Sequence, residues 1–141
     1  MEESIRLYSK IKEAFEMGEV DVKTYSPLTL AFIGDCVYDL VIRSYVTGQG
    51  NRATEGLHKS KSRLVKASAQ AEMIMRIYDR LTPEEQDIYR RGRNAKSHTM
   101  AKNATMADYR KATGLEALCG YLYLQDHMER VLELIKMGME D

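Results

Sequence analysis

The sequence is short of the features that mark secreted, zinc-binding and membrane-spanning proteins. Among its 141 residues are only two cysteines, Cys36 and Cys119. Neither belongs to a CxxC pair or lies at zinc-ligand spacing from a histidine, which excludes a zinc site and a secreted disulfide framework. No stretch approaches the roughly 20 apolar residues of a membrane span, and the N-terminal MEESIRLYSK lacks the apolar region of a signal peptide. We therefore expect a cytoplasmic protein with no membrane partner, in which both cysteines are reduced core residues.

The chain is predicted to form a single all-α domain. A hydrophobic share of 44% and a charged share of 30% are ordinary for a globular protein of this length. Apolar residues recur at spacings of three and four, and no convincing strand occurs. We expect helices over about residues 2–17, 27–47, 54–79, 83–92, 107–124 and 126–137. The first should pack into the core through an apolar stripe formed by Ile5, Tyr8, Ile11, Phe15 and Met17.

Two helix starts are signalled by capping residues. Ser26 before Pro27 reads as an N-cap followed by a first helical residue that has no backbone N–H to lose. Thr82 to Glu85 reads as a capping box with Pro83 at the first helical position. The helix that begins at Pro27 is apolar around most of its circumference, so we expect it to be buried.

Two acidic residues interrupt apolar helical runs. Asp35 lies within SPLTLAFIGDCVYDL and Glu116 within TGLEALCGYLYL, and glycines flank both. Because a buried carboxylate costs several kcal/mol when unpaired, something positive should face Asp35. The glycines suggest close approach of a backbone or a ligand. A shared metal site is one interpretation. The other is two separate buried ion pairs with Arg or Lys, since carboxylates on different helices need not meet.

The net charge of zero conceals two basic segments. Residues 43–71 carry a net charge of +5 and residues 90–111 carry +6. Concentrated Lys and Arg produce a local field able to displace counterions from nucleic acid, although the sequence pI is 6.8. The segment from 90 to 111 has little apolar periodicity and many small polar residues, so we expect an ordered loop that tracks phosphates. The plainer alternative is a pair of solvated surfaces.

Four separated blocks resemble one known family. FIGDCVYDL resembles the signature helix of the ribonuclease III family, and TGLEALCGYLYL resembles its later helix with a metal-binding glutamate. GLHKSKSRLVKASAQAEM and RRGRNAKS add a closer resemblance to the short branch called Mini-ribonuclease III, over roughly residues 20–135. The resemblance implies a homodimeric helical bundle of the ribonuclease III type, consisting of the catalytic domain alone without a double-stranded-RNA-binding domain.

The resemblance also implies an activity. Asp35 and Glu116 would hold Mg²⁺, with Mn²⁺ as a substitute, and cleave double-stranded RNA to leave a 5′-phosphate and a 3′-hydroxyl. The implied substrate is the base-paired ends of precursor 23S ribosomal RNA, with a ribosomal protein on that precursor as a further partner. Phe32 would lie near the two-fold axis of the dimer; the competing account places it in the monomer core.

The expected RNA-binding residues come from both basic segments. They are His58, Lys59, Lys61, Arg63, Arg91, Arg93, Asn94, Lys96, Ser97, Lys102 and Asn103. None of the three histidines is expected to be a metal ligand or a catalytic base.

Two departures from the family pattern leave alternatives open. Ala31 and Thr113 stand where the family has further acids, so the number of metal ions is open, as is the participation of Asp39. A catalytically weak domain that only binds structured RNA is the second hypothesis, and an unrelated helical interaction module is the third.

Overall fold

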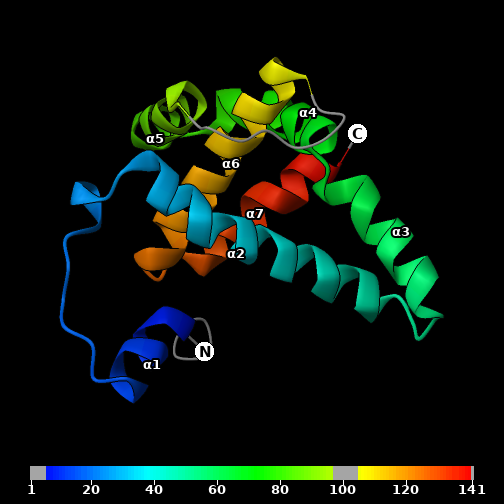
Figure 1. The fold of residues 1–141 in the computed structure, drawn as a ribbon, viewed down its shortest axis with the longest axis horizontal. Coiled ribbons are helices and arrows are strands. Elements are labelled where there is room, and N and C mark those ends of the chain that lie inside the picture. The colour runs from blue at the N-terminus through cyan, green and yellow to red at the C-terminus, as the bar shows by residue number, and fades with distance from the viewer. Residues whose placement is uncertain (1–5, 97–104, 141) are drawn as a thin grey trace.

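A computed structural model describes residues 6–96 and 105–140, and these residues form helices without a strand; a longer extended segment connects the first helix to the rest (Figure 1). The all-α prediction is therefore confirmed. The elements are α1 (Leu7–Ala14), η2 (Val22–Thr24), α2 (Pro27–Gly48), α3 (Thr54–Val65), α4 (Ala67–Ile77), η3 (Tyr78–Arg80), α5 (Pro83–Asn94), α6 (Met106–Leu124) and α7 (Met128–Met139). Three of the expected RNA-binding residues, Ser97, Lys102 and Asn103, lie outside the described residues.

The predicted helix starts are confirmed by their hydrogen bonds. The Ser26 hydroxyl accepts a bond from the backbone N–H of Thr29 at 3.2 Å, with Pro27 at the first helical position. Thr82 and Glu85 form the complete capping box of α5. These bonds join residues close in sequence, which is why local pattern was enough to find them.

The single helix predicted from 54 to 79 is wrong, because the chain breaks at Lys66. This residue has an extended backbone (φ −65°, ψ 156°) that ends α3 and starts α4. None of α3 is buried, whereas α4 buries an apolar face that includes Met73, Ile74 and Ile77. The break therefore separates α3, which contacts the core only through partly buried residues such as Leu57 and Leu64, from α4, which is part of the core.

The core forms where α2 crosses α6 (Figure 1). Nearly every residue of α6 from Ala112 onward is buried. At the crossing, a Cβ atom added to Gly34 would stand 1.6 Å from the backbone oxygen of Glu116, and one added to Gly120 would stand 2.0 Å from that of Leu30. The close backbone approach suggested by the glycines is therefore confirmed, and it is made by protein rather than by a ligand.

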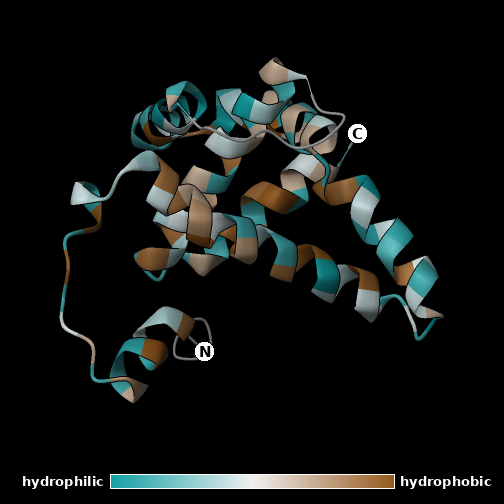
Figure 2. Cartoon of the chain, viewed as in Figure 1, coloured by the Kyte–Doolittle hydropathy of each residue, from teal (hydrophilic) through white to brown (hydrophobic). Residues whose placement is uncertain are grey.

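The expected burial of α2 around most of its circumference is wrong. Its buried face includes Leu30, Val37 and Ile42, but Phe32 is 80% exposed. Leu28, Leu40 and Cys36 are also exposed. Figure 2 shows hydrophobic residues along much of α2, and only one side of the helix meets α6. Of the two cysteines, only Cys119 is a core residue, and the account that placed Phe32 in the monomer core is contradicted.

The first helix meets the core through only part of the expected stripe: Tyr8 packs against it, whereas Phe15 and Met17 are exposed. No residue of α1 is buried, and Phe15 just beyond it is 74% exposed; Ile5 lies outside the described residues. Ser9 donates hydrogen bonds to Asp126 from its hydroxyl and its backbone N–H, and the ring of Tyr8 lies 5.5 Å from that of Tyr123. No helix within the described ranges is long and apolar enough to cross a bilayer.

Candidate active site

Helices α2, α3 and α6 enclose a cleft of about 810 Å³ that contains both acids singled out in the sequence. Asp35 enters it from α2 and Glu116 from α6. Neither forms an ion pair within the part of the chain that the structure describes. Asp35 is exposed in the cleft rather than buried, so the expected cation opposite it is not needed. The interpretation as two separate buried ion pairs is therefore wrong for these residues.

The two carboxylates lie close enough to affect each other. Burial, followed by the negative charge of Asp35, raises the pKa of Glu116 from 4.5 to about 8. A hydrogen bond from the side chain of Gln70 opposes this shift. Among the described residues, the cleft thus holds two interacting acids, neither of which forms an ion pair.

This pair fits a divalent metal ion that is held mainly by oxygen ligands. Mg²⁺ is commonly bound by one or two carboxylates and keeps several waters. Ala31 and Thr113 both line the cleft, so the positions where the family has acids do face this space but bring no charge. Among the described residues no cluster of three or more His, Cys, Asp or Glu is arranged to hold a metal. Asp35 and Glu116 are the acids of the cleft, within the described ranges, that take part in no ion pair.

Asp39 lines the same cleft but is already paired. Its carboxylate accepts a hydrogen bond from Arg43 Nε at 2.7 Å, and Lys61 Nζ lies 3.5 Å from its other oxygen. Two cationic side chains therefore contact this one carboxylate. Asp39 is thus part of an ion-pair cluster that joins α2 to α3 at the edge of the cleft.

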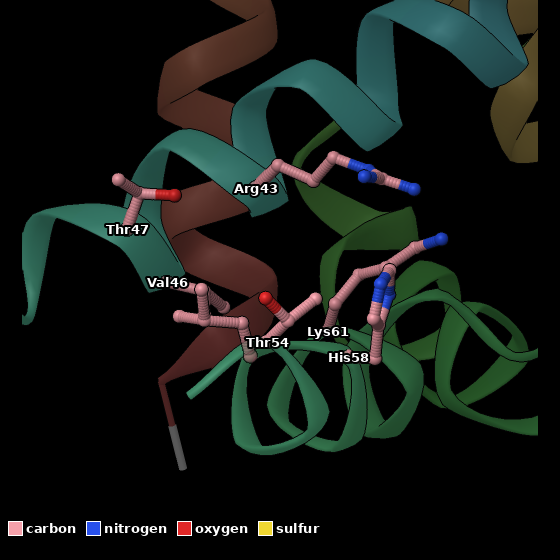
Figure 3. Close-up of a pocket in the computed structure, with 7 residues that line it drawn as sticks. Arg43, Val46, Thr47, Thr54, His58 and Lys61 are labelled. Carbon is pink, nitrogen blue, oxygen red and sulfur yellow. The ribbon is translucent and has the colours of Figure 1, made fainter. Parts of the chain in front are cut away.

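Lys61 links the acidic cleft to a second, smaller pocket. That pocket, of about 140 Å³, lies between α2 and α3 and is also lined by Arg43 and His58. Figure 3 shows Arg43 and Lys61 extending in the same direction, with the His58 ring beside Lys61. Arg43 was missed by the sequence analysis, although its spacing of four residues from Asp39 on a helix is typical of an ion pair.

The remaining basic residues of α3 are on its surface. Lys59 lies 3.7 Å from Glu55 one turn earlier, and Arg63 is exposed. Such exposed cations are free to exchange a weak intrahelical partner for a phosphate.

The second basic segment reaches the cleft region along α5. Arg91 and Arg93 are in the last turn of this helix, followed by exposed Lys96. The end of α5 packs against α6, where a Cβ atom on Gly92 would stand 3.3 Å from the backbone oxygen of Thr113. Arg93 also stacks over the ring of Tyr89 and bonds to Asn94.

Two further residues of the site were not found from the sequence. Tyr109 lines the cleft and accepts, through its backbone oxygen, a hydrogen bond from Thr113. Its position seven residues before Glu116 placed it on the same face of a helix, a signal that was available. Gln70 is only 3% exposed and donates to Glu116 at 3.3 Å. No sequence pattern connected it with an acid on another helix.

Comparisons with known proteins agree on one family. A family model described as the Ribonuclease III domain matches residues 28–127. Mini-ribonuclease 3 of Thermoanaerobacter sp. (strain X514) is 50% identical over 119 residues, covering 84% of each chain. Mini-ribonuclease 3 of Clostridium tetani is 45% identical over 123 residues, 86% of this chain and 82% of that one. The crystal structure of protein FN1578 from Fusobacterium nucleatum superposes with a TM-score of 0.75 at 33% identity, covering 84% of this chain and 94% of the other.

Proposed function

The chain belongs to the ribonuclease III family, in its Mini-ribonuclease 3 branch, and we propose that Asp35 and Glu116 are the catalytic acids with which it cleaves RNA. It is an endoribonuclease that acts on double-stranded RNA, and enzymes of this family depend on a divalent metal ion. The observation that carries the proposal is that the crossing of α2 and α6 brings two carboxylates from distant parts of the chain to one cleft, where neither forms an ion pair with any described residue.

Mg²⁺ is the metal ion that we propose for this cleft, with Mn²⁺ as a substitute. Asp35 and Glu116 would hold it, because hard oxygen ligands suit both ions. When bound, the ion would polarise the scissile phosphate and lower the pKa of a water molecule; as the water oxygen bonds to phosphorus, the bond from phosphorus to the 3′-oxygen would break, which gives a 5′-phosphate and a 3′-hydroxyl. Tyr109 and Thr113 line the wall of the cleft beside the acids, and they shape the space in which the phosphate lies.

The RNA duplex would lie across the cleft with cations on two sides. Lys61 stands at its edge, beside the pocket that also contains Arg43 and His58. Lys59 and Arg63 extend this set along α3, and Arg91, Arg93, Asn94 and Lys96 approach from the end of α5. These groups would neutralise phosphates and bond to the 2′-hydroxyls of a shallow minor groove, which favours duplex RNA over duplex DNA. Ser97, Lys102 and Asn103 stay predictions.

A homodimer would supply one cleft for each strand. Phe32 projects from α2 with 80% of its surface exposed, and Leu28, 40% exposed, lies one turn before it. Apolar side chains of this size on one helix are typical of a surface covered by a second copy. From the family resemblance we further propose that the substrate is the paired ends of 23S ribosomal RNA precursor, with a ribosomal protein as a partner on it.

The test is cleavage of a long RNA duplex by the purified protein. We expect fragments with 5′-phosphates in Mg²⁺ or Mn²⁺, none in excess chelator, and no cutting of duplex DNA or single-stranded RNA. Asp35→Asn and Glu116→Gln should each abolish cleavage while keeping the fold and RNA binding. Glu72→Gln is the control, since Glu72 is an exposed acid that pairs with Arg76 on α4.

Either acid variant cutting at near the parent rate would refute the assignment. Tight duplex binding by the parent without cleavage in any divalent metal would instead support the hypothesis of a domain that only binds structured RNA.

A further inference from the structure

Gln70 is a buried amide in the first turns of α4, where packing alone gives no reason for a polar side chain. It is 3% exposed, and its neighbours along the buried face of the helix are apolar. Its Oε1 atom is buried and has no hydrogen-bond partner among the described residues. A leucine of similar volume would pack there without leaving an oxygen unpaired. The contacts of the amide nitrogen are therefore the reason to expect a glutamine at this position.

The amide nitrogen joins two groups that belong to different parts of the fold. Gln70 Nε2 donates to the backbone oxygen of Val65 at 2.8 Å and to Glu116 Oε2 at 3.3 Å. A backbone carbonyl can only accept, so the nitrogen rather than the oxygen must face Val65. That orientation presents the second N–H to Glu116. One carboxylate oxygen of Glu116 is tethered in this way, while the side chain as a whole lines the cleft.

The same amide ties the acid to the break between α3 and α4. Val65 is the last residue of α3, which ends where the chain turns at Lys66. Its backbone oxygen accepts the hydrogen bond from the Gln70 side chain. The helix that ends there carries Lys61, which lines the same cleft as Glu116. One side chain thus fixes the Glu116 carboxylate relative to the helix that carries cations to the cleft.

We propose that Gln70 is a positioning residue that holds the carboxylate of Glu116 in the orientation needed to bind the metal ion, and this rests on the proposed role of Glu116 as a ligand. Outer groups that hydrogen-bond to a ligating side chain typically change metal affinity or activity by 10- to 100-fold when removed. Gln70 touches neither the substrate nor the ion in this account; it acts through Glu116.

The experiment measures Mn²⁺ binding to the RNA-free protein by titration, alongside kcat and KM on an RNA duplex. Gln70→Leu should weaken Mn²⁺ binding by about 10-fold or more and lower kcat at fixed metal, with KM and metal-free RNA binding unchanged. Gln86→Leu is the matched control: the Gln86 amide also donates to a backbone oxygen, that of Tyr78 at 3.1 Å, but lies away from the acids. It should leave Mn²⁺ binding and kcat at the parent values.

Glu116→Gln separates failure of this proposal from failure of the proposed function. If Glu116→Gln binds Mn²⁺ like the parent, Glu116 is not a ligand and the proposed function itself is wrong. If Glu116→Gln loses Mn²⁺ while Gln70→Leu keeps parental affinity and kcat, the positioning role is overturned and Gln70 only caps α3. Should Gln70→Leu not fold, Gln70→Met, which fills the space with a flexible apolar chain, is judged by the same criteria.

Discussion

The backbone oxygen of Glu116 lies directly against Gly34, so closely that a Cβ atom on Gly34 would stand 1.6 Å from it. This contact is between main chains, and neither partner can move aside by rotating a side chain. The residue after Gly34 is Asp35, so the crossing that requires a glycine is also the crossing that brings the two acids to one cleft. Fold and candidate site depend on the same point of contact.

Gly34→Ala should lower the free energy of unfolding by at least about 3 kcal/mol, because the added methyl group forces α2 and α6 apart. Denaturant unfolding followed by circular dichroism measures the change. Gly48→Ala is the control: it lies at the end of α2 with nothing within 4 Å of its added Cβ. It should be neutral or stabilise by up to about 1 kcal/mol. Equal stability of Gly34→Ala and the parent would contradict the close crossing.

The metal-free protein should lose stability as pH rises between about 4.5 and 8. In the unfolded chain Glu116 ionises at its ordinary pKa of 4.5, whereas burial and Asp35 raise the pKa to about 8 in the folded state. The folded state therefore binds an extra proton in this window, and that contribution is full at low pH and lost above 8. Glu116→Gln should flatten the dependence. A parent and a variant with parallel pH profiles of unfolding free energy would show that neither burial nor Asp35 raises the pKa of Glu116.

Removing cations at the end of α5 should weaken RNA binding. Arg91→Ala, Arg93→Ala and Lys96→Ala should each reduce the salt dependence of duplex binding by roughly one unit of slope or less, with cleavage retained at high enzyme concentration. Binding is measured in chelator at several salt concentrations. Arg76→Ala is the control, since Arg76 donates to the backbone oxygen of Gly138 near the C-terminus. Unchanged slopes in all three variants would mark the segment as a solvated surface.

Phe32→Glu should yield a folded monomer that has lost most duplex cleavage. The side chain is 80% exposed, so the monomer does not need it for its core, whereas a charge at an apolar interface opposes association. Sedimentation of parent and variant at micromolar concentration measures the state of assembly. Phe15→Glu, which alters a phenylalanine 74% exposed, serves as the control. A parent that sediments as a monomer and is fully active would refute the dimer.

The sequence by itself determined the helical class, the starts of α2 and α5 and the positions of the two acids. Capping bonds such as that between Ser26 and Thr29 join neighbours in the chain, so their pattern is visible without the fold. The glycines at positions 34 and 120 likewise signalled a close approach. These features depend on local backbone chemistry.

The tertiary structure alone decided which apolar residues are buried and which charges meet. Periodicity shows that α2 is apolar on several sides, but only the position of α6 selects Leu30 for the core and leaves Phe32 outside. The break at Lys66 is marked by no proline or glycine, so no local signal in the sequence predicted it. Asp39 pairs with Lys61, and Gln70 with Glu116, across helices whose relative placement no local pattern encodes. Contacts between distant residues are set by the packing of whole helices, so local pattern did not predict these two pairs. The meeting of Asp35 and Glu116 in one cleft was expected only as one interpretation of the two acids and from the family resemblance.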